Sequence, residues 1–336
     1  MQPGKLPADL LASLLAEVPS RDPRVLLGPG IGRDAAVIDM GGPNLLVAKT
    51  DPITFASDRI GWYAVHVNAN DIACLGARPA WFLATIFLPE GAPPSLARSI
   101  FSQITQACES LGVTLVGGHT EITYGLDRPI ISGAMLGEVD RDALVRPDGA
   151  QRGDALILTG GIAIEGTAVL AREAPARLAA LGVRAETLAA AREYLADPGI
   201  SVVLAARAVC DAVKVHAMHD PTEGGLATAL YEMAEASGLG LVIDENCISV
   251  LPATRDLCEA AGLDPLGVLA SGALLIAVAE DDCDAVLSAV RAAGCSARRI
   301  GGFVPQPGVI MTSSSQRKPV PRFQRDEVAR FLSQTV

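Results

Sequence analysis

The stretch "RIGWYAVHVNANDIACLGA", residues 59 to 77, sets the plan of the N-terminal half of this chain. Trp62, His66 and Asn70 recur at four-residue steps, so they share one face of a helix. A glycine and then a proline follow, which is typical of a helix end. The next residues, "AWFLATIFL" at 80 to 88, are an apolar run of strand length. This segment therefore predicts a buried helix that leads directly into a core strand.

One carboxylate lies inside this apolar helix. Asp71, in "NAND", is about one turn from both Val67 and Leu75. Burying an unpaired charge costs a large amount of free energy, which a nearby cation offsets. An aspartate at a strand end is usually only a turn residue or a helix cap, but that explanation does not fit Asp71. The sequence therefore predicts a cation beside Asp71.

Upstream of the helix, a glycine-rich loop, "GPGIGRDAAVID" at 28 to 39, places Asp34 just before a strand. Apolar runs at 35–39 and 45–50 flank "GGPN", which is a hairpin signal. The second run ends in "KTD", so Asp51 lies at a strand end. The loop fits no common nucleotide fingerprint, because it precedes a strand and not a helix.

Further acids follow apolar runs downstream, with Glu121 after "VGGHT" and Asp220 after "VHAM". Glycine turns at 28–32, 117–118 and 224–225 would let backbone N–H groups approach a polyphosphate closely. The segment "HDPTEGGLATAL" adds a helix N-terminus, which favours an anion. Carboxylate oxygens are the ligands of Mg²⁺, which commonly bridges one or two carboxylates to phosphate. The four histidines show no zinc-like spacing with cysteine, and no P-loop motif is present.

Strands and helices mix without strict alternation over the whole chain, which favours an α+β fold. A polar segment at 141–154 predicts a domain boundary. The predicted domains are 1–145, 152–312 and a tail with a final helix at 313–336. Other predicted helices are 7–18, 95–111, 225–238, 252–261 and 282–293, and predicted strands are 240–243, 273–279 and 297–304. The segment "TSSSQRKPVPR" is predicted to be a loop.

The chain has 336 residues, 50% of them hydrophobic and 19% charged, which predicts two core-rich domains. A net charge of −11 argues against nucleic-acid and anionic-membrane partners. Seven scattered cysteines without a C-x-x-C pair indicate reduced thiols and a cytoplasmic location. The longest apolar run is too short to span a bilayer.

Six motifs in order resemble those of the aminoimidazole ribonucleotide (AIR) synthetase superfamily. They are "GRDAAVI", "KTDPITF", "VNANDIACLGARP", "VGGHTE", "GDALILTGGIAIEG" and "MHDPTEGGLATALYEMAEASG". The similarity covers nearly the whole chain and is strongest to the hydrogenase-maturation (HypE-like) branch. It implies an α+β fold of two PurM-like domains, with an N-terminal domain that forms a β-barrel across a homodimer and a C-terminal α/β sandwich domain.

The resemblance also implies a Mg-ATP site between the domains, with the glycine loop as a lid over phosphate. The implied metal ligands are Asp34, Asp51, Asp71 and Asp220. Implied catalytic groups are Asp71, His119, Asp220 and Glu232, and implied nucleotide-binding residues are Gly30, Gly32, Lys49, Thr50, Asn70, Gly117, Gly118, Thr120 and Gly224. The expected activity is the use of an ATP phosphate to activate an oxygen of a second, unidentified substrate, which is small or protein-borne.

Several positions depart from the pattern of the hydrogenase-maturation branch. That branch carries a C-terminal cysteine, whereas the last cysteine here is Cys295. Its acid-His-Gly motif is replaced by Ile164-Glu165-Gly166, and its double aspartate by Arg33-Asp34. Three hypotheses follow. They are a dehydratase without the C-terminal cysteine, a nucleotide-binding accessory protein with reduced turnover, and a small-molecule kinase like thiamine-monophosphate kinase.

Overall fold

The computed structural model describes residues 6, 8–19, 22–30, 32–314 and 316–334. The chain divides into two compact units. We call the first the sheet-A unit, which comprises the described residues of Ser20–Gly28 and Asp34–Leu144. The second, the sheet-B unit, comprises the described residues of Met1–Pro19, Pro29–Arg33 and Val145–Val336. The described residues of Pro29–Arg33 in the glycine loop therefore belong to the sheet-B unit, while Gly28 and Asp34 belong to the sheet-A unit.

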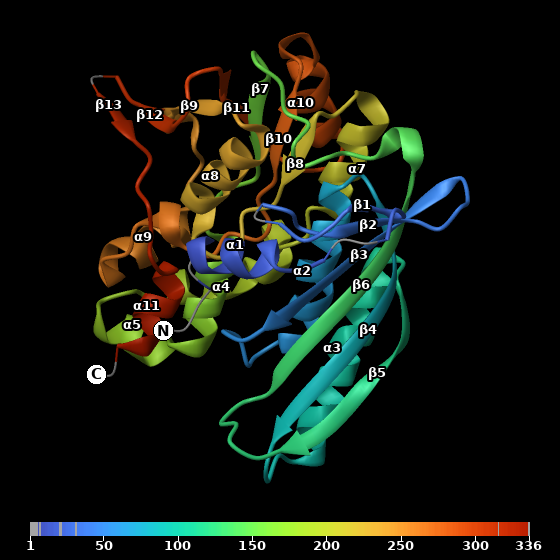
Figure 1. The fold of residues 1–336 in the computed structure, drawn as a ribbon. Coiled ribbons are helices and arrows are strands. Elements are labelled where there is room, and N and C mark those ends of the chain that lie inside the picture. The colour runs from blue at the N-terminus through green and yellow to red at the C-terminus, as the bar shows by residue number, and fades with distance from the viewer. Residues whose placement is uncertain (1–5, 7, 20–21, 31, 315, 335–336) are drawn as a thin grey trace. The chain divides into compact units, whose positions relative to one another are not determined.

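The sheet-A unit is a six-stranded mixed sheet with two helices (Figure 1). The strands run in the order β1-β2-β3-β6-β4-β5, and only the β4–β5 pair is parallel. The element bounds are β1 Val25–Leu27, β2 Ala36–Asp39, β3 Asn44–Ile53, α2 Ile60–Cys74, β4 Arg78–Pro89, α3 Pro94–Leu111, β5 Thr114–Thr123 and β6 Ile130–Asp140.

Alternation along the strands of sheet A decides which face carries the helices. Phe82, Ala84 and Ile86 on β4 are buried, while the residues between them are only half-buried. Because successive strand residues point to opposite faces, the buried set faces α2 and α3. Nearly every residue of α2 is buried, whereas α3 buries one narrow stripe. The predicted buried helix and the strand that follows it are therefore present.

The sheet-B unit is built on a seven-stranded sheet in the order β13-β12-β9-β11-β7-β10-β8. Its core contains the apolar face of α8, with Leu226, Leu230 and Met233 packed together with Leu156 and Leu275 from the sheet. The strands are β7 Ala155–Thr159, β8 Ala217–His219, β9 Gly240–Asp244, β10 Leu275–Val278, β11 Ala297–Val304, β12 Val309–Thr312 and β13 Arg317–Pro319. The helices are α1 Ala8–Ala16, α4 Ile164–Glu173, α5 Pro175–Ala180, α6 Ala185–Glu193, α7 Val203–Ala212, α8 Gly225–Ser237, α9 Pro252–Ala261, α10 Cys283–Ala292 and α11 Glu327–Ser333.

One local prediction was wrong. Residues 317–319 form strand β13, which pairs antiparallel with β12, although the serine- and proline-rich segment predicted a loop. Both prolines that follow Lys318 stand at the edge of the sheet or beyond it, where a missing N–H breaks no interior ladder. None of the helices that the structure describes has the length and hydropathy to cross a lipid bilayer.

Candidate functional site

A partly buried lysine lies among three acidic residues in the sheet-A unit, and we call Asp34, Lys49, Asp51 and Asp71 the lysine cluster. Lys49 Nζ lies 3.2 Å from Asp71 Oδ2 and 3.5 Å from Asp51 Oδ2. The Asp71 side chain is only 4% exposed and that of Lys49 18%. Burial acts to lower the pKa of Lys49, but the charges of Asp71, Asp51 and Asp34 outweigh it, so the pKa rises well above its usual range. Lys49 therefore stays charged and compensates the buried charge of Asp71, while the metal ion that the sequence predicted there stays a prediction.

Strand periodicity and one asparagine bring this cluster together. Lys49 and Asp51 alternate on β3 with Thr50, so both point toward α2, the helix that carries Asp71. Asn68, also on α2, accepts a hydrogen bond from Asp51 N at 2.8 Å. Its amide nitrogen donates to the carbonyl oxygens of Asp51 and Ala64. Asn68 therefore holds β3 against α2 at Asp51, two residues before the strand ends.

Thr50, predicted as a nucleotide neighbour, points to the opposite face of the sheet. Its hydroxyl donates to the carbonyl oxygen of Gly133 on β6 at 2.8 Å. Asn70 is fully buried on α2, next to Asp71 in the chain. Asn70 thus lies beside the lysine cluster, and Thr50 stabilises the pairing of β3 with β6.

The ladder of sheet A separates the β5 residues from the lysine cluster. Asp51 pairs with Gly133, Gly133 with Ala84, and Ala84 with Gly118, so these residues form one row across the sheet. Three strand spacings of about 4.8 Å put Gly118 about 14 Å from Asp51. His119 pairs with Thr85, on the face away from α2. Gly117, Gly118, His119 and Thr120 therefore do not join Asp71 within one sheet-A unit.

The predicted β5 residues have local structural roles as well. His119 Nε2 lies 3.1 Å from Glu121 Oε2, and both side chains are exposed. A side chain at position 118 would collide with the Ala84 carbonyl group of the neighbouring strand. Gly118 is thus required by the pairing of β4 with β5 whether or not a phosphate binds there. The nucleotide role of these residues stays a prediction.

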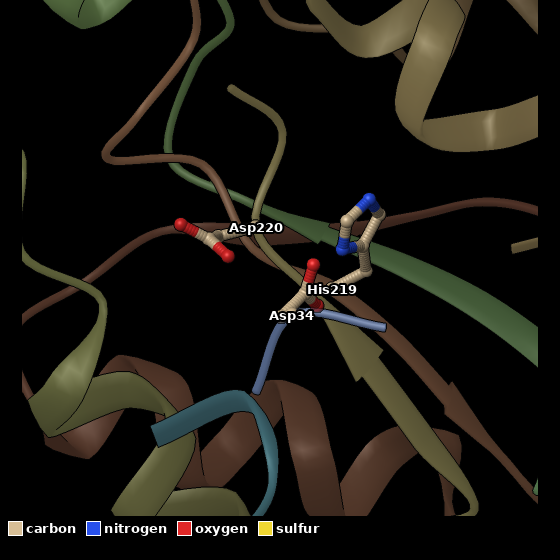
Figure 2. A group of neighbouring side chains, drawn as sticks. All are labelled: Asp34, His219 and Asp220. Carbon is tan, nitrogen blue, oxygen red and sulfur yellow. The ribbon is translucent and has the colours of Figure 1, made fainter. Parts of the chain in front are cut away.

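In the sheet-B unit, two consecutive site residues leave the carboxyl end of β8. His219 and Asp220 are 6% and 1% exposed, and Figure 2 shows both side chains. His219 Nε2 lies 2.8 Å from Glu232 Oε2 on α8. Gly32 of the glycine loop has a left-handed φ of 67° and packs beside the Glu232 carbonyl oxygen. The structure therefore places Gly32, Asp220 and Glu232 in one neighbourhood, together with His219.

Gly224 lies just before α8 and uses its N–H group locally. With φ at 81°, it adopts a conformation that favours glycine, and its N–H donates to Asp326 Oδ2 at 2.7 Å. Asp326 also caps α11, because its other oxygen accepts from Val328 N. The Asp326 carboxylate thus accepts the hydrogen bond from the Gly224 N–H group, which was predicted to bind phosphate.

The folds and motifs of both units match known proteins. Residues 32–139 match the family model described as "AIR synthase related protein, N-terminal domain", and residues 151–313 match its C-terminal domain. Carbamoyl dehydratase HypE of Cupriavidus necator is 35% identical over 282 residues, which cover 81% of this chain and 77% of that protein. The chain belongs to the AIR synthase-related family.

Two solved structures extend this similarity over most of the chain. A crystal structure of hydrogenase maturation protein HypE in complex with ATP has a TM-score of 0.73 at 25% identity, covering 90% of this chain and 92% of that one. A crystal structure of a HypE–HypF complex has a TM-score of 0.71 at 25% identity, covering 87% and 94%. The predicted superfamily, with its HypE-like motifs, and the predicted α+β fold of two PurM-like domains are confirmed.

A second group of acids lies in the sheet-B unit around Glu165, the residue that departs from the acid-His-Gly motif. Glu165 is 5% exposed in the first turn of α4. Burial raises its pKa to about 8, the Ser271 hydroxyl lowers it, and the nearby charges of Asp326, Glu223 and Asp220 raise it further. Burial likewise raises the pKa of Asp326 to about 7. At neutral pH Glu165 therefore keeps its proton, and Asp326 is partly protonated.

Sequence reasoning missed Asn68, His219 and Glu165 as parts of these clusters. The spacing of the histidines argued only against a zinc site with cysteine. The position of His219 directly before Asp220 was the signal that could have included it. Asn68 lies three residues before Asp71 on the same helix and could have been found from that spacing. Glu165 was visible only as a departure from a motif, because its burial depends on segments more than 50 residues away.

Proposed function

We propose that this chain is a Mg-ATP-dependent enzyme of the HypE-like class, which transfers an ATP phosphate to an oxygen of a second substrate. The observation that carries the proposal is the lysine cluster, in which a buried aspartate and two further carboxylates face a charged lysine. The ATP complex of HypE, at 25% identity, supports nucleotide binding by this fold. Transfer of the phosphoryl group would convert that oxygen into a leaving group.

The donor atoms in the lysine cluster fit magnesium. Asp34, Asp51 and Asp71 offer carboxylate oxygens, which are the ligands that Mg²⁺ prefers. We propose these three residues as metal ligands, and Asp220 of the sheet-B unit stays a predicted ligand. When bound, Mg²⁺ neutralises phosphate charge. Lys49 would contact phosphate oxygens once the metal has taken over the carboxylates, and Asn68 would keep Asp51 in position. Gly30, Gly32 and Asn70 stay predicted nucleotide contacts.

The finer proposal is a dehydratase of the hydrogenase-maturation type with a protein-borne substrate. The 35% identity to carbamoyl dehydratase HypE and the solved HypE–HypF complex support it. Glu165 favours a second candidate, a nucleotide-binding accessory protein with reduced turnover, because it stands where the related branch has histidine. ADP formation in the presence of a substrate separates the two candidates.

We also propose a homodimer that pairs through β5. This edge strand is exposed over most of its length and carries the exposed apolar side chains of Leu115, Val116 and Ile122, followed by Tyr124. Exposed apolar edge strands favour pairing with another chain. Sedimentation equilibrium is expected to give twice the chain mass of 34.7 kDa. A single chain mass across the concentration range would exclude the dimer.

The activity is tested by replacing the buried aspartate. Asp71→Asn keeps the shape of the side chain and removes its charge, so ATP turnover with Mg²⁺ should fall by at least about 100-fold, as when one preorganised polar group is lost. Asp148→Asn is the control, because Asp148 pairs with Arg146 at the surface. Unchanged turnover in Asp71→Asn would contradict the proposal.

A further inference from the structure

A cavity of about 360 Å³ lies at the edge of sheet B, beside β12 and β13. Its volume falls within the range of small-molecule sites, which begins at about 300 Å³. Met311 and Ile162, which line it, are buried members of the core. Three further lining residues, Ile248, Val250 and Leu266, are only partly buried, and we call them the apolar floor. The cavity therefore offers apolar surface that a ligand would remove from water.

Three prolines stiffen the walls of this cavity. Pro265 begins a single 3₁₀ turn, Pro319 lies on the edge strand β13, and Pro321 follows that strand. A proline ring fixes its own φ and offers no N–H group. Asp264, which also lines the cavity, is held in place because its Oδ1 accepts a hydrogen bond from Leu266 N at 3.0 Å. The cavity is thus formed before a ligand arrives, so binding requires little ordering of its walls.

The lining of the cavity includes two opposite charges that lie side by side. Lys318 Nζ lies 3.6 Å from Glu245 Oε1, and the two side chains are 50% and 40% exposed. At this distance the two groups form an ion pair but not a hydrogen bond, so both keep hydrogen-bonding capacity for a ligand. Exposed ion pairs contribute little to stability, and a ligand can therefore separate this one at small cost.

A second exposed ion pair in the same unit provides a matched comparison. Arg299 Nη2 donates to Glu280 Oε2 at 2.8 Å, and these side chains are 50% and 52% exposed. The pair is closed by a hydrogen bond, and neither residue lines the cavity. The pair of Lys318 and Glu245 differs in both respects, because it is longer and stands beside the apolar floor.

We propose that this cavity binds a free apolar α-amino acid, such as phenylalanine or leucine. Its side chain would cover the apolar floor, its carboxylate would bind Lys318, and its ammonium group would bind Glu245. A ligand with a single charge would leave one member of the separated pair without a partner, whereas a zwitterion replaces both partners. Asp264 adds a second negative charge to the lining, which favours the ammonium group. The site requires neither nucleotide nor metal, so it does not rest on the proposed function.

Isothermal titration calorimetry of the full chain with L-phenylalanine tests the proposal, together with two analogues that each lack one charge. L-phenylalanine should bind saturably. 3-Phenylpropionate, which lacks the ammonium group, and 2-phenylethylamine, which lacks the carboxylate, should bind at least about tenfold more weakly. Glu245→Gln should weaken binding of L-phenylalanine by a similar factor but not binding of 3-phenylpropionate. Lys318→Met should weaken binding of L-phenylalanine but not binding of 2-phenylethylamine.

Arg299→Met and Glu280→Gln are the control variants and should leave the affinity for L-phenylalanine unchanged. Absence of saturable binding of both L-phenylalanine and L-leucine at millimolar concentration would overturn the proposal. Equal affinities for L-phenylalanine and its two analogues would do the same, because the apolar floor alone would then explain binding, and so would an affinity that survives both Glu245→Gln and Lys318→Met. Circular dichroism checks that each variant is folded, and the analogue series on the wild-type chain decides the question without any substitution.

Discussion

The two acidic groups of this chain accommodate buried carboxyl groups in different ways. In the lysine cluster, a partly buried lysine accompanies Asp71, Asp51 and Asp34, and its pKa rises because the carboxylates are charged. Around Glu165, three acids surround a fourth without a cation among the causes of its pKa shift, and the pKa of Glu165 rises to about 8. The first group keeps its charges and suits a metal and phosphate. In the second group, Glu165 keeps its proton at neutral pH.

The largest expected effect comes from removing the lysine. Lys49→Met leaves Asp71 buried without its cation, which should lower the free energy of unfolding by about 3 kcal/mol at neutral pH. The raised pKa of Lys49 means that its contribution is complete below the ordinary value of 10.5 and is lost as pH rises above it. Urea unfolding at neutral and acidic pH measures the effect.

Two further results would test whether Lys49 compensates the charge of Asp71. Protonating Asp71 at low pH should reduce the deficit of Lys49→Met, and added Mg²⁺ should restore part of it by supplying another cation. Lys318→Met, which removes an exposed partner of Glu245, is the control and should change stability little. Equal losses for both lysine variants would mean that Lys49 is an ordinary surface charge.

The next effect concerns the protonated acids. The folded pKa of Glu165, about 8, lies above its ordinary value of 4.5, so between these pH values the unfolded chain is ionised while the folded chain keeps the proton. Stability should therefore fall as pH rises through this window. Glu165→Gln should remove about 5 kcal/mol of that fall, given 1.36 kcal/mol per pH unit.

Thermal or urea unfolding of the wild type and Glu165→Gln across the window measures the difference. Asp326 should still contribute in the variant, with the same sign, because burial raises its pKa to about 7. Glu259→Gln on α9 serves as an exposed control. Parallel pH profiles for the wild type and Glu165→Gln would show that Glu165 is ionised in the folded chain, and the contrast between the two groups would disappear.

The smallest effect should come from the asparagine that holds Asp51. Asn68→Ala removes the acceptor for Asp51 N and should cost about 1–2 kcal/mol of stability. It should also raise the Mg²⁺ concentration needed for half-maximal ATP turnover, because Asp51 is no longer fixed. Asn246→Ala, in an exposed turn, is the control. A change in stability without a change in Mg²⁺ requirement would limit Asn68 to a structural role.

The sequence predicted elements well where the pattern is local. Helix 252–261 has the predicted bounds in the structure, and the hairpin of 35–39 and 45–50 is present as β2 and β3. Composition and period determine such segments, and tertiary contacts adjust only their ends. The strand at 317–319 was missed because its pairing with β12 outweighs a sequence typical of loops.

The candidate site was harder to predict, for a different reason. The burial of Asp71 was predicted correctly, because an acid in an apolar helix is a strong local signal. Lys49 was predicted only as a nucleotide-binding residue. Its ion pair with Asp71 was not predicted, because no local pattern shows that β3 directs the Lys49 side chain toward α2. The distance of His119 from Asp51 follows from the order of strands in the sheet, which no local pattern encodes.

Calorimetric titration of ATP into the full chain, with Mg²⁺ and then with the metal chelated, tests the central claim most directly. The account predicts saturable binding in the presence of Mg²⁺ that is lost or strongly weakened without it, because the carboxylates of an acidic protein repel an unaccompanied triphosphate. Binding of equal strength with and without the metal, or no binding in either case, would contradict it.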